Sequence, residues 1–197
     1  MTTKKEQIFK AIISHINRAG LLKNLTIAEI AQMAEVGKGT VYEYFTSKDE
    51  IICETIIYIL DSIMSQILIE ITPNIEFQSI LIKHIEAMFK VSQQYSNIDM
   101  ILMTDGISST LETEHKQKLM NKVKTIKRQY TNYLKNVISL GVGEGIIKDY
   151  PEEYIIYIVG NIIMSSISYY YHELPLEKRN EEEQINKTYQ TIIKLLT

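Results

Sequence analysis

Residues 26–50 read TIAEIAQMAEVGKGTVYEYFTSKDE, a pattern typical of two short helices joined by a tight turn. Thr26 and Glu29 have the spacing of a capping box, in which each side chain bonds the other residue's backbone N–H at a helix start. Apolar residues then recur at helical spacing until the pattern breaks at Glu35-Val36-Gly37. A second apolar pair, Val41 and Phe45, follows the break. Since helices this short cannot form a core alone, we predict a helix-turn-helix packed on neighbouring helices.

The second of these helices carries residue types that suit nucleic acid. If Val41 and Phe45 face inward, a cation, a hydroxyl and two phenols remain on the other sides, and such groups contact phosphates and base edges. Ser47 and Glu50 form a second predicted capping box, and the lysine in this next helix start lies where helix N–H groups favour a phosphate. The pattern alone leaves open that these are ordinary exposed polar residues. The residues concerned are Lys38, Thr40, Tyr42, Tyr44 and Lys48.

The order of residues resembles a known family. The segment IAEIAQMAEVGKGTVYEYFTSKDEI is similar to the N-terminal helix-turn-helix of TetR-family transcriptional regulators, a match that covers roughly the first third of the chain. It runs through Ile30-Ala31, Ala34, Val36, Lys38-Gly39-Thr40, Tyr42, Tyr44-Phe45 and Ser47-Lys48. The resemblance implies that double-stranded operator DNA is held by Thr26, Lys38, Gly39, Thr40, Tyr42, Tyr44 and Lys48.

Three positions depart from the family pattern. Glu35 stands where the turn usually has Gly, so a non-glycine residue is expected to adopt a left-handed conformation. Gly37 stands where Ser or Thr commonly caps the recognition helix, and the loop from Gly20 to Leu25 is a residue longer than the commonest pattern. None of these departures removes the DNA-reading face, but they leave an alternative open: a protein-interaction or coactivator protein on the same fold.

Charge is divided unevenly along the chain. The 197 residues carry a net charge of −3, yet residues 1–48 hold seven Lys or Arg against four Asp or Glu. A basic head on an acidic body is typical of a DNA reader with a separate regulatory part. The single cysteine, Cys53, falls in an apolar helical pattern and is predicted to be a buried thiol. The N-terminus lacks the apolar run of a signal peptide, so a cytoplasmic protein is expected.

The remaining sequence predicts an all-α protein of about nine helices, with a DNA-binding domain at 1–47 and an effector-binding and dimerisation domain at 48–197. Strand-like alternation is scarce. The first helix is expected at Lys4–Ala19, with Ile8, Ile12, Ile16 and Ala19 as its buried stripe. Later helices are expected at Lys48 to about Ile71, Ile75–Gln94, Ile98–Ile107, Leu111–Leu140, Glu152–His172 and Leu176–Leu196.

Residues 154–171, YIIYIVGNIIMSSISYYY, carry no formal charge over 18 positions. This length reaches the lower edge of a membrane span, but Asn161, three serines and the tyrosines favour a helix buried between its own body and a second subunit. The resemblance implies a homodimer through a four-helix interface, here residues 152–172 and 176–196. A two-fold dimer would read two half-sites of a palindrome.

No catalytic or cofactor motif stands out. Glu112 and His115 form one Glu-x-x-His unit, but carboxylate di-iron bundles need two, and the lone cysteine argues against zinc sites. We therefore expect neither an enzyme nor a metal or cofactor site. The resemblance implies instead a cavity in the body for a small, largely apolar effector. Candidate lining residues are Met64, His84, Met88, Met103, Tyr130, Tyr133, Asn161 and Ser165. The favoured interpretation is a ligand-responsive transcriptional repressor.

Overall fold

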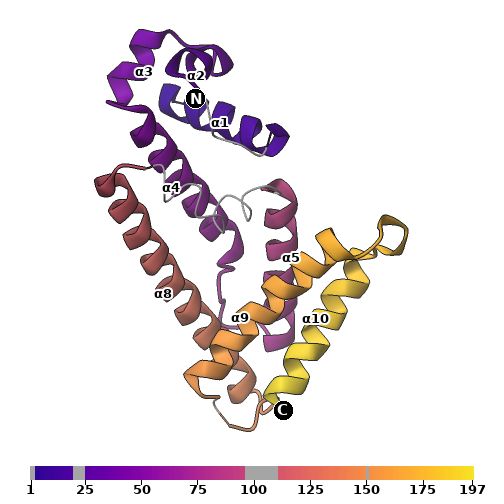
Figure 1. Ribbon diagram of the computed structural model, residues 1–197. Coiled ribbons are helices and arrows are strands. Elements are labelled where there is room, and N and C mark those ends of the chain that lie inside the picture. The colour runs from indigo at the N-terminus through magenta and orange to yellow at the C-terminus, as the bar shows by residue number, and fades with distance from the viewer. Residues whose placement is uncertain (1–2, 20–24, 96–110, 150) are drawn as a thin grey trace. The chain divides into compact units, whose positions relative to one another are not determined.

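The computed structural model describes residues 3–19, 25–95, 111–149 and 151–197. Within these ranges the chain is helical and contains no strand, as the sequence predicted (Figure 1). The α-helices are α1 (Lys4–Ala19), α2 (Ile27–Met33), α3 (Lys38–Tyr44), α4 (Lys48–Ile67), α5 (Phe77–Gln94), α8 (Thr113–Gly143), α9 (Glu153–Ser168) and α10 (Glu181–Leu196). A π-helical turn, η1 (Tyr169–Glu173), and a 3-10 turn, η2 (Leu176–Lys178), lie between α9 and α10. The helix predicted at 98–107 lies outside the described residues.

The chain divides into two compact units. The first unit falls within residues 1–62 and 95–125, and the second within 63–94 and 126–197. Helices α4 and α8 therefore contribute residues to both units. These two units are defined by how compactly their residues pack. The predicted boundary between residues 47 and 48 instead separates DNA binding from effector binding, and it stays a prediction.

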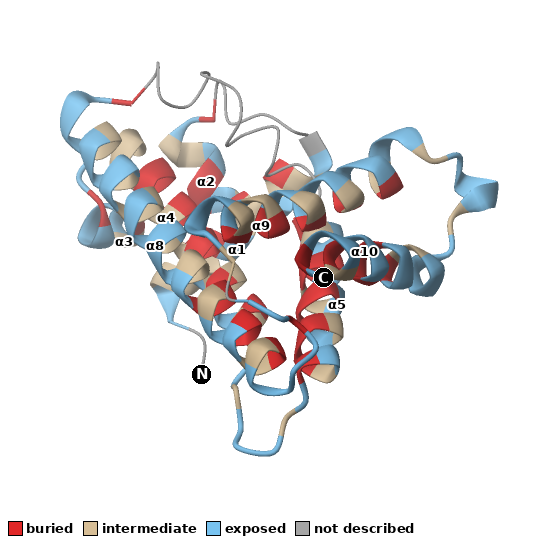
Figure 2. Cartoon of the chain, turned by 90° about the horizontal axis from the view of Figure 1, so that it is seen from below, coloured by how far each residue is buried: buried red, intermediate tan, exposed pale blue. Residues whose placement is uncertain are grey.

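The core of the first unit is built on α1, which packs against both α2 and α3. The predicted stripe is buried at Ile8, Ile12 and Ile16, each at most 1% exposed. From the other helices, Ile30, Ala31, Val41 and Phe45 complete this core. In Figure 2 the buried residues of these helices are drawn red. Burial of apolar surface at about 25 cal/mol per Å² is what holds such short helices in place.

Helix α4 begins at Lys48 as predicted but ends at Ile67, about four residues before the predicted end. At this end the Ile67 carbonyl lies 2.8 Å from Nδ1 of His84, and it also accepts from the Ile69 N–H at 3.1 Å. A carbonyl only accepts, so Nδ1 carries the proton and donates. The imidazole N–H thus donates to a carbonyl that would otherwise accept from a backbone N–H of the next helical turn. No local sequence signal marks this stop.

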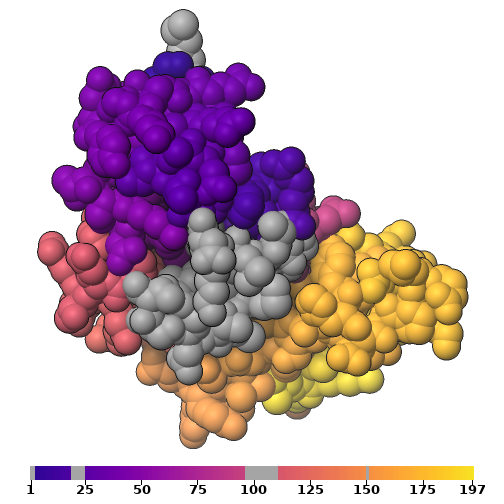
Figure 3. Space-filling view, turned by 45° about the horizontal axis from the view of Figure 1, so that its top comes forward, coloured from indigo at the N-terminus to yellow at the C-terminus, as the bar shows by residue number. Residues whose placement is uncertain are grey.

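The second unit packs α5 against α9 and α10, and α9 against α10. Figure 3 shows the orange and yellow surfaces of this C-terminal segment adjoining each other. Gly160 on α9 lets α8 approach, because a Cβ there would lie 3.1 Å from Cε1 of Tyr130. Similarly, a Cβ on Gly141 would lie 2.8 Å from Cδ1 of Ile147. Glycine is required at both positions by space, not by backbone conformation.

Several predicted ends in the second unit were wrong. Helix α5 starts at Phe77, not at Ile75, and the Phe77 N–H donates to Glu144 Oε1 at 2.7 Å. The last helix starts at Glu181, not at Leu176, because the Asn180 side chain caps it by accepting from the Glu183 N–H. Helix α8 runs past Leu140 to Gly143, and α9 ends at Ser168 before the π-helical turn.

Within the described ranges, none of the helices combines the length and the apolar character that crossing a membrane requires.

The imidazole of His84 predicts a pH dependence of stability. Burial lowers its pKa to about 4, partly opposed by the bond to Ile67. Between about pH 6.5 and 4 the unfolded chain binds more protons at this residue than the folded chain does, so the free energy of unfolding falls as the pH is lowered. We expect a loss of roughly 3 kcal/mol across this window, measured by urea unfolding at constant ionic strength.

The test variant is His84→Gln, because an amide does not titrate yet offers both a donor and an acceptor. It should lose less unfolding free energy than the wild type over the same pH window. His172→Gln, which removes an exposed imidazole, is the control and should retain the wild-type curve. Parallel curves for the wild type and His84→Gln would contradict the role of His84.

Candidate nucleic-acid interface

The start of α2 shows the predicted capping box in full. Oγ1 of Thr26 accepts from the Glu29 N–H at 3.2 Å, and Oε2 of Glu29 accepts from the Thr26 N–H at 2.8 Å. The Thr26 hydroxyl also donates to the same carboxylate oxygen at 2.8 Å, and these bonds lower the pKa of Glu29. The hydroxyl proton is therefore already engaged, so a phosphate contact from Thr26 requires it to leave Glu29.

The turn after α2 is a Schellman motif, the common way in which helices end in a left-handed residue. The Val36 N–H donates to the Ala31 carbonyl at 3.0 Å and the Glu35 N–H donates to the Gln32 carbonyl at 3.1 Å. The left-handed position is Glu35, with φ 52°, which confirms the prediction from the sequence. Glycine would occupy this conformation without the steric cost that a side chain pays.

One side of helix α3 is buried in the core, and most residues on its other sides are exposed to solvent. Val41 is fully buried and Phe45, directly after the helix, is 2% exposed, as predicted. Gly37 is the N-cap and makes no side-chain bond, so the missing cap is also confirmed. Among the predicted DNA contacts on this helix, Lys38, Gly39, Tyr42 and Tyr44 are exposed and Thr40 is half-buried. Figure 3 shows α1 to α4, indigo to purple, as one continuous surface.

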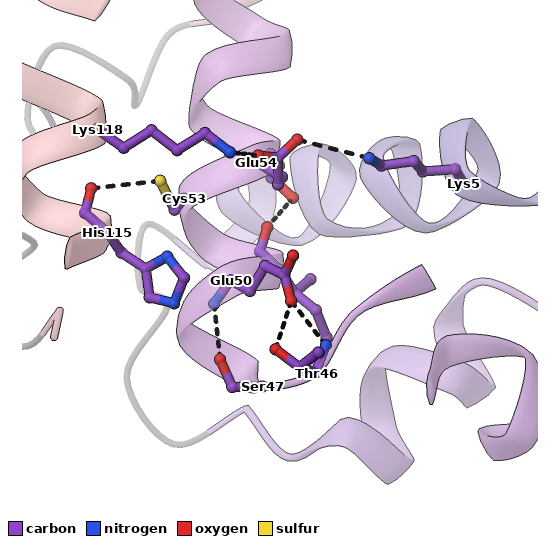
Figure 4. A network of polar contacts seen from close by, with 10 residues as sticks. Lys5, Thr46, Ser47, Glu50, Cys53, Glu54, His115 and Lys118 are labelled. Carbon is purple, nitrogen blue, oxygen red and sulfur yellow. Dashed lines mark hydrogen bonds and ion pairs between the residues drawn. The ribbon is translucent and has the colours of Figure 1, made fainter. Parts of the chain in front are cut away.

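The start of α4 differs in one bond from the predicted capping box. Oγ of Ser47 accepts from the Glu50 N–H at 3.1 Å, but the Glu50 carboxylate reaches back to Thr46 (Figure 4). Its Oε2 accepts from the N–H and from the hydroxyl of Thr46, both at 2.7 Å, and these bonds lower the pKa of Glu50. Lys48 lies half-buried in this first turn, and its positive charge contributes to the lowered pKa of Glu29.

The helix-turn-helix is fixed to its neighbours by contacts that sequence reasoning missed. The Glu54 carboxylate on α4 pairs with Lys5 of α1 at 3.5 Å and with Lys118 of α8 (Figure 4). Burial raises the pKa of Glu54, but the two lysines more than offset this and lower it overall. The ammonium of Lys5 also lies 5.3 Å from the ring centroid of Phe45, beside the end of α3. Glu54 and Lys118 are 64 residues apart in the chain, so no local pattern signals their contact.

The thiol of Cys53 lies in this region and is fully buried, as predicted. It donates to the His115 carbonyl at 3.4 Å (Figure 4), and burial raises its pKa. A thiol with a raised pKa is a structural group, because the thiolate is the reactive form. Among the described residues, no group of three or more His, Cys, Asp or Glu is placed to hold a metal ion.

In the second unit the structure brings together three of the predicted effector contacts. Nε2 of His84 lies 3.1 Å from the Tyr130 hydroxyl, and the His84 and Tyr133 rings are 4.9 Å apart. Burial raises the pKa of Tyr130, and it raises that of Tyr133 to about 12, opposed in part by the Ile69 backbone. The Tyr133 oxygen is buried without a hydrogen bond of ordinary geometry among the described residues.

Of the other predicted effector contacts, Met64 and Met88 are buried. Asn161 and Ser165 are exposed on α9, and the Asn161 amide donates to the Tyr157 carbonyl of its own helix at 2.9 Å. The structure therefore does not bring Asn161 or Ser165 to the His84 cluster. Met103 lies outside the described residues.

Comparison with known proteins identifies the helix-turn-helix. The family model of bacterial regulatory proteins, tetR family, matches residues 22–55, which span α2, α3 and the start of α4. Residues 22–55 therefore form a TetR-family helix-turn-helix, which makes the chain a DNA-binding transcriptional regulator and not an enzyme. An uncharacterised HTH-type transcriptional regulator of Bacillus subtilis, YvdT, is 28% identical over 163 residues, which cover 80% of this chain and 79% of that protein.

Solved structures of TetR-family regulators share the fold over nearly the whole chain. A TetR regulator from Haloarcula marismortui aligns with a TM-score of 0.71 at 18% identity, covering 98% of this chain and 96% of that one. The regulator FadR of Bacillus subtilis, solved in complex with stearoyl-CoA, aligns with a TM-score of 0.72 at 18% identity, covering 98% and 99%. At such low identity these likenesses establish the fold alone.

The two departures in the turn predict stabilising substitutions. Glu35→Gly should raise the free energy of unfolding by about 0.5–1 kcal/mol, because glycine adopts a positive φ without steric cost. Gly37→Ser should add a few tenths of a kcal/mol by capping α3, where a new Cβ would lie 3.9 Å from Thr40 Oγ1. Both are measured by urea unfolding.

Gly145→Ala is the control of opposite sign. Gly145 has φ 72° and open space around it, so the added methyl group should destabilise the chain through backbone strain alone. A loss of stability in Glu35→Gly would show that the side chain contributes more than its conformation costs.

Proposed function

We propose that this regulator is a cytoplasmic, dimeric repressor that a small, largely apolar effector releases from a palindromic operator. The observation that carries the proposal is the set of exposed residues on α3. Val41 is buried and α3 packs against α1 and α2, so a cation, phenols and a glycine remain exposed. The departures at Glu35 and Gly37 alter the turn and the cap, but they leave this exposed set in place. The exposed set on α3 therefore favours DNA over the protein-interaction alternative.

The proposed operator contacts are mainly with phosphates. Lys38, Thr40 and Lys48 supply cations and a hydroxyl, and the Tyr42 and Tyr44 phenols can donate to phosphate or pack on thymine methyls. Tyr42 is 58% exposed and Tyr44 is 41% exposed. A helix of seven residues is about 10 Å long and so contacts few base pairs. Selective binding then requires two heads on two half-sites, which is the reason for proposing a palindrome.

The proposed dimer interface uses residues 152–172 and 176–196. On α9 the exposed residues recur at helical spacing and none of them carries a charge between residues 154 and 171. Tyr154 is 66% exposed, Tyr157 is 60% exposed and Met164 is 38% exposed. An uncharged face with large apolar groups is typical of a protein–protein contact, and a second copy of the same face would cover it.

The proposed effector site surrounds His84, Tyr130 and Tyr133. Their rings give an aromatic lining, and the Tyr133 hydroxyl is a buried polar group whose bonding capacity a ligand could complete. The Bacillus subtilis FadR structure holds stearoyl-CoA, which supports testing long-chain acyl-CoA molecules first. Such an effector acts as an inducer only through a higher affinity for a state that binds the operator weakly.

Replacing Lys48 tests the DNA interaction. Lys48→Ala removes one proposed phosphate neighbour, so binding to all sequences should weaken and the slope of log K against log salt should become shallower by about one unit per chain. Binding is measured by fluorescence anisotropy on DNA from upstream of the gene, with random DNA as competitor. Sedimentation should show two chains for each operator.

Lys127→Ala is the matched control, because it removes an exposed cation on α8 outside the helix-turn-helix. It should leave the salt dependence unchanged. If Lys48→Ala and Lys127→Ala behave alike, Lys48 makes no phosphate contact.

The effector proposal predicts release of the operator by acyl-CoA molecules. Titrating stearoyl-CoA into the repressor–operator complex should lower the operator affinity by about fivefold or more, in the usual range of coupling free energies, whereas coenzyme A alone should not. Tyr133→Phe removes the unpaired hydroxyl and should change the effector affinity while preserving operator binding. If a panel of acyl-CoA molecules and free fatty acids leaves operator affinity unaltered, the apolar-effector proposal is wrong.

A further inference from the structure

The outermost residues of α3 are Gly39 and Glu43. At about 100° per residue, each lies about 160° around the helix from buried Val41, on the side farthest from the core. Both are exposed. Lys38 and Tyr42 flank this pair on one side, and Thr40 and Tyr44 flank it on the other. The α3 side chain that lies farthest from the core is therefore a carboxylate, that of Glu43. The residues on both sides of it are of types that contact phosphate.

Gly39 leaves space for this carboxylate. Helical side chains lean toward the N-terminus and cover the residue four positions earlier, which for Glu43 is Gly39. A Cβ built on Gly39 would meet no atom within 4 Å. The surface beneath Glu43 is therefore open, so the backbone of α3 can approach another molecule closely and bring the carboxylate against it.

Glu43 also differs in its bonding from neighbouring carboxylates. Glu29 is bonded to Thr26, Glu50 to Thr46, and Glu54 to two lysines. Among the described residues, Glu43 has neither a hydrogen-bond partner nor an ion pair. Facing DNA without a partner, it would be repelled by the phosphates and would lose hydration at a cost. A donor supplied by the DNA itself removes this penalty.

We propose that Glu43 reads cytosine, accepting a hydrogen bond from the N4 amino group at one position in each half-site. This inference rests on the proposed docking of α3 in the major groove. A carboxylate only accepts, and the major groove offers donors only at cytosine N4 and adenine N6. Adenine places the N7 acceptor beside its amino group, which repels a carboxylate, whereas cytosine presents the amino group alone. Guanine and thymine present acceptors and are rejected.

The test is selection of binding sites from a random double-stranded DNA library by the full-length protein. The wild type should select a two-fold symmetric motif with a C·G pair at one position in each half. In Glu43→Gln that position should change to A·T, because glutamine bonds adenine N6 and N7 together. On single-site probes, the wild type should prefer C over A about tenfold and Glu43→Gln should reverse the order.

Glu35→Gln is the matched control. It removes an exposed carboxylate of the same motif that lies in the turn and not on α3. It should tighten binding to all DNA without altering the selected bases, and thermal unfolding should show that both variants fold. An unchanged motif in Glu43→Gln, or a uniform gain equal to that of Glu35→Gln, would overturn the cytosine contact alone. Failure of the wild type to select any sequence would overturn the docking proposal as well.

Discussion

Helices of seven residues are unstable alone in water, because the first hydrogen-bonded turn costs more conformational entropy than so few bonds return. Both α2 and α3 have this length, so they depend on the apolar contact with α1. Val41 and Phe45 are the anchors, since each is almost completely buried. Their burial fixes which sides of α3 remain outside. The exposed chemistry of this helix is therefore a consequence of two apolar residues.

The same logic applies to α4, whose two ends are set by polar groups outside the helix. Its N-terminus is capped by Ser47, and its last carbonyl accepts from His84 of α5 and from the Ile69 N–H. Between these ends, Glu54 bonds to lysines of two other helices. Polar contacts thus satisfy the backbone at both ends of α4 and join its side to two other helices. Its apolar residues determine which side is buried.

Local patterns in the sequence predicted the elements that local interactions determine. The limits of α1, the capping box at Thr26, the left-handed Glu35 and the missing cap at Gly37 all depend on residues a few positions apart. The end of α4 was predicted about four residues too late, and one of the two bonds to its last carbonyl comes from a side chain 17 residues away, which no local pattern indicates. Residue type does not indicate Glu43 as a DNA contact, because a carboxylate repels phosphates. It becomes informative only with the structure, in which it has no partner among the described residues and the space at Gly39 is open.

The donor and acceptor roles around His84 limit which residues can replace it during evolution. Nδ1 donates to Ile67, so the neutral imidazole must accept at Nε2 and Tyr130 must donate. A replacement therefore has to offer one donor and one acceptor at similar separation, and residue 130 has to keep a donor facing it. Positions 84 and 130 should consequently covary, with glutamine as the alternative at 84 and phenylalanine at 130 tolerated only beside a residue that needs no donor.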